Sequence, residues 1–377
     1  MPFFEKKKSP KELIQGVNDN LTILSNSQNE KDQKNAVNQI AKLLSQIKEM
    51  LIDKSDSRIT NKEKDQETSN SERERIKEIV SDITIEMINL DMFLPLIMKL
   101  EILEFESMKQ VVEIFGHVFR IQSENYISYY SAANHLATKP DVLRALLNSY
   151  EKPATIPHCG EILRDVCRHE IVCGIVLRQP EFYQLFQHAQ STAFDLSSDS
   201  FATIKELVTR HKKMVSSFIE ENFDDFFGHY QKLYLSDNYM TQRQALKVLS
   251  EILLDGYNSN IMIRYISETK NLKNIMNLLK NDRKQLAFEA FHCFKVFFAA
   301  PEKPKAILTI LYQNQERLIE FLKNFQSERT DDGQLQSEKE YVINQIKALK
   351  MPIENSSSKT ASSSNIASSN DQLTTKH

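Results

Sequence analysis

Apolar residues in this sequence recur at intervals of three and four positions, the spacing of one face of an α-helix, and the alternation typical of β-strands is almost absent. Two helix starts are marked by capping boxes. Ser9, Pro10 and Glu12 supply an N-cap hydroxyl, a proline at the first helical position and a reaching carboxylate, so we expect a helix to begin there. A second capping box, from Ser337 to Glu340, predicts the start of the last helix.

A pattern of two apolar residues three positions apart recurs through the middle of the chain, at intervals of 48, 41, 45 and 42 residues. The pairs are Phe115 and Val118, Leu163 and Val166, Ile204 and Leu207, Leu249 and Ile252, and Phe291 and Phe294. This period is typical of armadillo and HEAT repeats, which bury their apolar stripes by stacking into a superhelix with a concave face. We therefore predict an all-α, armadillo/HEAT-like helical-repeat solenoid. A globular helical bundle with accidental spacing is the alternative.

Two segments lack the apolar residues that a packed repeat needs. Residues 53–75 contain 13 charged residues and a single aliphatic one, Ile59, so we expect a flexible charged loop there. Residues 351–377 are rich in serine and poor in apolar residues, which predicts a disordered tail and leaves its phosphorylation open. The predicted repeat domain therefore covers 1–350.

Composition disfavours several functional classes. Only 7 of the 377 residues are glycine, about 2% where roughly 7% is usual, and no two have the spacing of a dinucleotide fingerprint or a P-loop. The formal charge is −3, with 48 basic and 51 acidic residues, so the molecule as a whole carries no field that would concentrate nucleic acid. We accordingly expect no nucleotide chemistry and no nucleic-acid partner.

The sequence also predicts a cytoplasmic protein. Its first residues lack a long apolar segment, Pro2 stands where myristoylation needs glycine, and no apolar run approaches the roughly 18 residues of a membrane span. The four cysteines form no C-x-x-C pair, which indicates reduced and mostly buried thiols.

Two groups of residues suggest metal sites, and neither has the right spacing. His158, Cys159, Cys167, His169 and Cys173 lie within sixteen residues, but structural zinc sites use ligand pairs two to four residues apart, so core cysteines and capping histidines are the preferred interpretation. If Gly333 were the sixth position of an EF-hand loop, the twelfth would be a lysine instead of a bidentate carboxylate. We expect no metal or calcium site and no cofactor.

Nothing isolates a catalytic set either, since no G-x-S-x-G elbow or comparable nucleophile motif occurs. Six aromatic residues cluster at helical spacing between Phe218 and Tyr234, which favours core packing. Immediately after them, Thr241 begins an apparent capping box that puts Arg243 in the first turn of a helix, with Tyr239 just before it. These residues leave two interpretations of Arg243 open. Its side chain is either simply solvated or part of an exposed, ligand-facing rim that it shares with Tyr239.

Met276 also has two interpretations. It belongs to a stripe with Leu272, Ile275 and Leu279 at the spacing of a helix face, which by itself predicts a core position. Several lysines and arginines surround the stripe, Lys273 among them. Met276 could therefore floor an adaptable apolar groove with a cationic rim, suited to a peptide that carries aromatic and acidic groups.

Together, several segments resemble the Mo-twenty-five-like scaffold family, also called calcium-binding protein 39. The likeness covers roughly residues 1 to 350 and is densest from Cys159 to Leu322. The segments that carry it are Met1–Phe3, Leu163–Arg164, Arg168–Glu170, Ser200–Thr203, Thr209–Lys212, Asn238–Tyr239, Arg243–Gln244, Leu253–Asp255, Phe288–His292 and Phe294–Phe297.

The resemblance implies an armadillo-like helical rod without enzymatic activity, which holds sterile-twenty-like kinases and pseudokinases in an active conformation. Phe194, Tyr239 and Arg243 resemble the residues that the family uses on a concave surface to bind the kinase-like lobe. Lys273 and Met276 match positions that bind a C-terminal tail peptide of the partner.

Three positions depart from the family pattern: Gly256 and Ser259 replace an arginine and a phenylalanine that follow the Leu-Leu-Asp segment in relatives, and Gln313 replaces a lysine near the implied tail site. The partner's tail can therefore differ from the animal one. The alternative function is a helical-repeat transport or nucleic-acid-binding adaptor, and the absence of tryptophan and the balanced charge argue against it.

Overall fold

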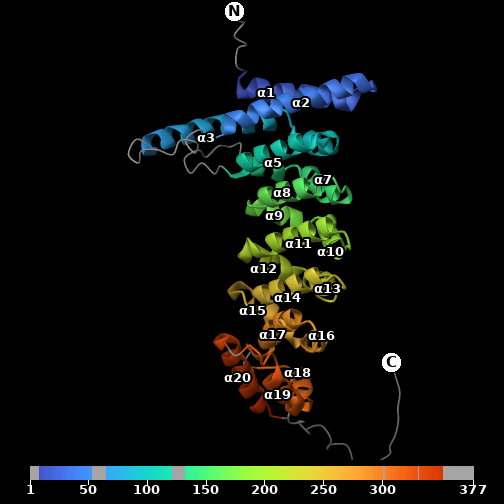
Figure 1. Cartoon of the computed structure of the whole chain (residues 1–377), viewed down its shortest axis with the longest axis vertical. Coiled ribbons are helices and arrows are strands. Elements are labelled where there is room, and N and C mark those ends of the chain that lie inside the picture. The colour runs from blue at the N-terminus through green and yellow to red at the C-terminus, as the bar shows by residue number, and fades with distance from the viewer. Residues whose placement is uncertain (1–7, 53–64, 121–131, 300–301, 330, 351–377) are drawn as a thin grey trace, which may run out of the picture. The chain divides into compact units, whose positions relative to one another are not determined.

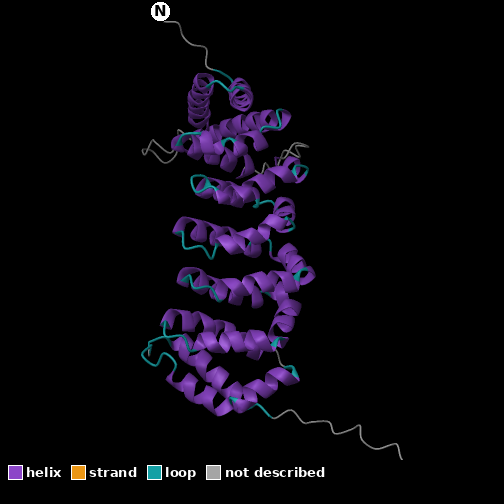
Figure 2. Cartoon of the chain, turned by 90° about the vertical axis from the view of Figure 1, so that its right-hand side faces the viewer, coloured by secondary structure: helices purple, strands orange, loops and turns teal. Residues whose placement is uncertain are grey.

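The computed structural model describes residues 8–52, 65–120, 132–299, 302–329 and 331–350, with the side chains of 65–70 left out. Across these ranges the regular structure is entirely helical, as Figure 2 shows. The chain divides into two compact units, Met1–Ala300 and Pro301–His377. The prediction of an all-α helical-repeat fold is confirmed.

The first unit begins with an antiparallel pair of helices, α1 (Pro10–Asn26) and α2 (Glu30–Leu51), and continues with five groups of three. The first helices of the groups are α3 (Asp65–Asn89), α6 (Ala132–Ala137), α9 (Glu170–Leu177), α12 (Lys212–Glu221) and α15 (Ser259–Ser267). The second helices are α4 (Phe93–Met98), α7 (Pro140–Asn148), α10 (Gln184–His188), α13 (Phe223–Tyr234) and α16 (Thr269–Leu279). The third helices are α5 (Phe105–Arg120), α8 (Ile156–Val166), α11 (Phe194–Thr209), α14 (Tyr239–Leu253) and α17 (Lys284–Ala299). Short 3₁₀ turns, η1 (Leu100–Ile102), η2 (Ser149–Glu151), η3 (Pro180–Tyr183) and η4 (Gly256–Asn258), connect some of them.

Corresponding helices of successive groups pack against one another. The third helices form a continuous series, in which α2 packs on α5, and then α8, α11, α14 and α17 follow (Figure 1). All five apolar pairs that set the sequence repeat lie on these third helices and are buried, from Phe115 to Phe294. The repeat in the sequence is therefore the repeat of the central series of helices.

Two histidines, each in the segment that follows a third helix, contact the end of the preceding third helix. His169, just before α9, lies 2.9 Å through Nε2 from the carbonyl oxygen of Phe119 near the end of α5. His211, just before α12, lies 2.8 Å through Nε2 from the carbonyl oxygen of Cys167 at the end of α8. Each imidazole satisfies a carbonyl group that the helix itself leaves without a partner. The contact of His169 agrees with the capping role expected for that residue.

A buried polar network joins α8 to α11. The Arg164 guanidinium donates to both carboxylate oxygens of Asp199, at 3.0 and 3.1 Å, and to the Thr203 hydroxyl at 2.7 Å. The Tyr150 hydroxyl, fully buried, donates to Asp199 at 2.7 Å. Gly160 makes room for this arrangement, because a Cβ atom there would stand 1.9 Å from Asp199 Oδ2.

The second unit contains α18 (Lys305–Gln313), α19 (Gln315–Asn324) and α20 (Gly333–Lys347), and α19 packs on α20. Leu322 and Ile346 are buried. Lys339 is also buried, and its ammonium group donates to the Phe325 carbonyl oxygen at 2.7 Å. Burial lowers the pKa of Lys339.

The predicted start of the first helix is correct, and the predicted start of the last helix is wrong. Ser9 caps α1 with both hydrogen bonds of a capping box. The last helix begins at Gly333, because Asp332 accepts from the backbone NH of Leu335 at 3.0 Å, while Ser337 lies inside the helix and donates back to the Gly333 carbonyl. Starting five residues earlier buries Leu335, and aspartate caps as well as serine does.

The charged segment also differs from the prediction. Helix α3 begins at Asp65, so residues 65–75 are helical, while 53–64 lie outside the described residues. Ion pairs one turn apart, Glu72 with Arg75 and Glu74 with Lys77, each at 2.7 Å, support the helix. Beyond them Ile76 and other buried apolar residues hold the helix in the core. The serine-rich tail, 351–377, also lies outside the described residues.

Candidate partner-binding surface

The starts of α11 and α14 lie at one edge of the first unit, and backbone carbonyls hold them together. The Asn238 side chain caps α14 by accepting from the backbone NH groups of Met240 and Thr241, and it donates to the Ser191 carbonyl at 3.1 Å. The Thr241 hydroxyl donates to the Ala189 carbonyl at 2.6 Å. These bonds fix the start of α14 against the loop that leads into α11.

The predicted capping box at Thr241 is therefore wrong. Asn238 takes the N-cap position, because the Thr241 hydroxyl is occupied by the Ala189 carbonyl of the preceding group. Arg243 is the fifth residue of α14 and belongs to its second turn, where the macrodipole no longer opposes a cation strongly.

Two aromatic residues open these helices. Phe194 is the first residue of α11, and 71% of its surface is exposed, the largest fraction for any large apolar residue in the described part of the chain. Tyr239 is the first residue of α14 and is half-buried, with the Arg283 guanidinium 4.9 Å above its ring. A cation at that distance from a ring centroid is attracted to the ring face, which restricts the Tyr239 side chain.

Arg243 is held by an acid from the next group. Its Nε donates to Glu289 Oε1 of α17 at 3.3 Å, and the Glu289 side chain is 10% exposed while that of Arg243 is 38% exposed. Within the described residues the two Nη groups of Arg243 make no further hydrogen bond. Glu289 thus orients the Arg243 side chain, and the Nη groups of Arg243 can still donate to a ligand.

Lys273 and Met276 lie together on α16, one turn apart. Lys273 is exposed, and Met276 is half-buried, whereas Leu272, Ile275 and Leu279 of the same predicted stripe are buried. Met276 is therefore neither a core residue nor a free one, and its thioether is accessible beside a lysine. The structure thus places Phe194 at the start of α11, Tyr239 and Arg243 in the first two turns of α14, and Lys273 and Met276 on α16.

The other candidate groups belong to the core. The aromatic residues from Phe218 to Tyr234 are buried, as predicted, and are distributed over α12 and α13. All four cysteines are buried, and burial raises the pKa of the Cys159, Cys167 and Cys293 thiols. The described residues contain no group of three or more His, Cys, Asp or Glu side chains that could hold a metal ion.

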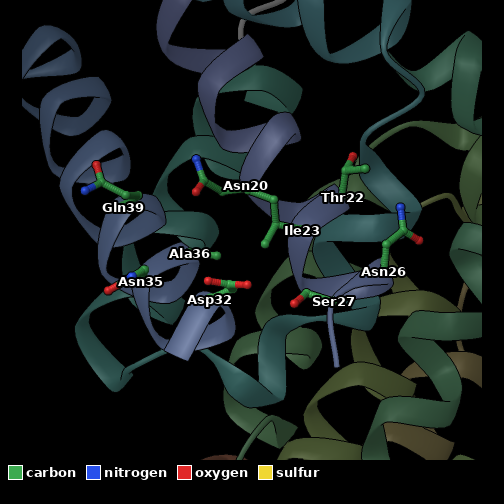
Figure 3. A pocket seen from close by; sticks show the side chains of 9 residues that line it. All are labelled: Asn20, Thr22, Ile23, Asn26, Ser27, Asp32, Asn35, Ala36 and Gln39. Carbon is green, nitrogen blue, oxygen red and sulfur yellow. The ribbon is translucent and has the colours of Figure 1, made fainter. Parts of the chain in front are cut away.

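A hollow of about 510 Å³ opens between α1 and α2. Figure 3 shows Asn20 and Ile23 of α1 across from Asp32 and Asn35 of α2. Six of its nine lining residues carry an amide or hydroxyl group, and Asp32 is the single titratable side chain among them. No acid and base converge there, so this hollow does not have the arrangement of a catalytic site.

Sequence reasoning missed the exposed aromatic residue Phe105 and the partners that orient Tyr239 and Arg243. Phe105 opens α5 with 60% of its surface exposed, packs its edge on His158 at 5.4 Å and lies 4.5 Å from the Lys109 ammonium. The sequence signal that could have identified Phe105 was an aromatic residue at a helix start that belongs to no apolar stripe. The pairing of Tyr239 with Arg283 left no such signal, because it depends on how α14 meets α17.

Stacked three-helix groups define an armadillo-like helical-repeat protein, and its exposed aromatic and cationic residues form a candidate surface for a partner. The chain belongs to the Mo25-like family, whose model matches residues 2–350. It is 39% identical over 351 residues to the mouse (Mus musculus) protein "Calcium-binding protein 39-like", covering 93% of this chain and 98% of that one.

Relatives outside mammals match over the same length. The chain is 36% identical to "MO25-like protein 2" of Caenorhabditis elegans over 354 residues, covering 93% of this chain and 99% of that one. It is 33% identical to the "Mo25-like protein" of Schizosaccharomyces pombe over 347 residues, covering 92% and 99%. The family is a scaffold family. Among the helices of the described ranges, none is long and apolar enough to cross a membrane.

Proposed function

We propose that the protein is a non-catalytic cytoplasmic scaffold that binds sterile-twenty-like kinases or pseudokinases and activates them allosterically. The observation that carries the proposal is the edge formed by Phe194, Tyr239 and Arg243 in a chain of the Mo25-like family. An exposed aromatic beside an oriented arginine is the composition of an energetic centre in protein interfaces.

The proposed mechanism is a population shift. A kinase lobe that contacts this edge only when its regulatory helix is in the active position is stabilised in that position. A coupling of about 1 to 3 kcal/mol changes the activity about 5- to 150-fold. Stacked helices suit this role, because the network of Arg164 and Asp199 and the Arg243–Glu289 pair keep the contact residues fixed before the partner arrives.

A tail segment of the partner is proposed to bind at Lys273 and Met276. The half-buried thioether offers an adaptable apolar contact and the exposed ammonium a partner for a carboxylate. Gly256 of η4 and Ser259 of α15 supply no cation or aromatic ring at the start of the same group, while Tyr257 between them is 60% exposed. The tail that this protein binds therefore differs from a tail whose binding needs a cation at position 256 and an aromatic ring at position 259.

The test measures the activity of a purified sterile-twenty-like kinase with and without the full chain. We expect several-fold activation by the wild type and little by Phe194→Ala, Tyr239→Ala or Arg243→Ala. Arg178→Ala, which removes an exposed arginine from the end of α9, is the matched control and should activate normally. Equal activation by all variants, or none by the wild type with any kinase of the group, would contradict the proposal.

A further inference from the structure

The solvent-facing side of α16 is a stripe of lysines. Lys270, Lys273, Asn277 and Lys280 are exposed, and at 100° per residue they fall within about 80° of the helix circumference. The buried residues Leu272, Ile275, Leu278 and Leu279 occupy the opposite side. The stripe runs about 15 Å along the helix axis.

No acid of the helix compensates these charges. Between Thr269 and Leu279 there is no Asp or Glu, and within the described residues none of the three lysines takes part in an ion pair. Corresponding second helices differ in this respect. On α7, Asp141 pairs with Arg144 at 3.0 Å, and Asp224 of α13 pairs with Arg264 at 2.8 Å.

This arrangement carries an electrostatic cost in the free protein. Lys270 lies in the first turn of α16, where the helix macrodipole opposes a cation, and Lys273 follows one turn later on the same side. A surface helix gains stability from acids in its first turn, and apart from the N-cap residue Glu268, α16 has none at this end. An anionic ligand laid along the stripe would relieve both the dipole and the like-charge repulsion.

We propose that the lysine stripe of α16 binds an acidic peptide segment that continues the partner's tail along the helix. The proposal rests on the proposed tail site, because Met276 lies between Lys273 and Lys280 along the helix and supplies an apolar contact beside the stripe. A stripe of about 15 Å accommodates four or five residues of extended peptide. The preferred tail therefore has two or more acidic residues in addition to its aromatic terminus.

The test uses two labelled twelve-residue peptides with the full chain, read by fluorescence anisotropy. Both end in Phe-Glu-Phe with a free carboxylate, and four glutamates precede this end in the first peptide and four serines in the second. We expect the glutamate peptide to bind about tenfold more tightly at low salt, and the difference to shrink as the salt concentration rises.

Charge reversal then locates the effect. Lys270→Glu with Lys280→Glu should abolish the preference for the glutamate peptide and leave binding of the serine peptide unchanged. Lys232→Glu, at an exposed lysine of α13, is the matched control and should keep the preference. Circular dichroism checks that the double variant retains its helix content.

The outcomes separate this inference from the tail site itself. Equal binding of both peptides would overturn the proposal that the lysine stripe binds acidic residues, while the proposed tail site would stand. Binding of neither peptide overturns both. If the glutamate segment binds equally without Phe-Glu-Phe, the stripe is supported and the tail site falls. Tighter binding of a single-stranded oligonucleotide than of the glutamate peptide, lost in the same double variant, would assign the stripe to nucleic acid and overturn the proposal.

Discussion

Arg243 Nε donates to Glu289 Oε1 across 3.3 Å, and this pair joins α14 to α17. Because the glutamate is mostly buried and the arginine partly exposed, the two residues have separable roles. The acid fixes the orientation of the guanidinium, and the guanidinium is available to a partner.

Arg243→Ala should cost about 1 to 2 kcal/mol of unfolding free energy, because it leaves the Glu289 carboxylate without its cation. Adding Glu289→Gln should recover most of that loss, since a neutral amide tolerates burial better than a carboxylate. Kinase binding should stay weak in the double variant. Urea unfolding and a pull-down measure the two effects, and recovery of binding together with stability would mean that Arg243 acts only through the fold.

Phe194→Ala should leave the melting temperature unchanged, since 71% of the residue is exposed and little apolar area is lost from the core. Binding of the kinase lobe should weaken at least tenfold if Phe194 is an energetic centre of the interface. Calorimetry of the variant and titration with the kinase provide the comparison. A lower melting temperature with unchanged binding would return Phe194 to a structural role.

Met276→Ala should reduce binding of the tail peptide while lowering stability by about 1 kcal/mol, less than for a core residue because Met276 is only half-buried. Ile275→Ala, one residue earlier and completely buried, should cost about 2 to 5 kcal/mol. Peptide titration and thermal unfolding of both variants decide the matter. A Met276→Ala loss as large as that of Ile275→Ala would identify a core position.

Gly160→Ala should destabilise the protein by about 2 to 4 kcal/mol, because the new Cβ would stand 1.9 Å from Asp199 Oδ2 and push the carboxylate away from Arg164 and Tyr150. Gly228→Ala on α13 is the matched control, since a Cβ there meets nothing within 4 Å. That change should stabilise the helix by about 0.5 to 1 kcal/mol. Equal and small effects of the two changes in urea unfolding would show that the network readjusts freely.

Stability should fall as the pH drops from about 7 to about 5. Burial lowers the pKa of four histidines below the ordinary value near 6.5, and these are His117, His158, His188 and His229. In that range the unfolded chain binds more protons than the folded one, so protonation favours unfolding. His229→Gln should flatten the pH dependence of the urea midpoint, and a midpoint that rises on acidification would contradict the assignment.

The sequence predicted the helical repeat because the core requires it. Leu163 and Ile204 occupy equivalent places because the third helices of successive groups pack on one another. The spacing of these residues stays recognisable although the loops between the helices differ in length. The caps were harder, because Asn238 and Thr241 are both good N-cap residues and the choice depends on the Ala189 carbonyl of another group. Likewise the half-burial of Met276 and the position of Arg283 over Tyr239 depend on how neighbouring helices meet.

The histidine contacts at the ends of α5 and α8 each reach only the adjoining group of helices. Disruption of one of these histidine contacts therefore does not directly destabilise a distant group of helices. We expect a chain cut between α11 and α12 to lose the groups beside the cut first, while native-state hydrogen exchange at α5 remains slow. The consequence for evolution is that groups far from α11 and α14 can change sequence without disturbing the residues proposed to bind a partner.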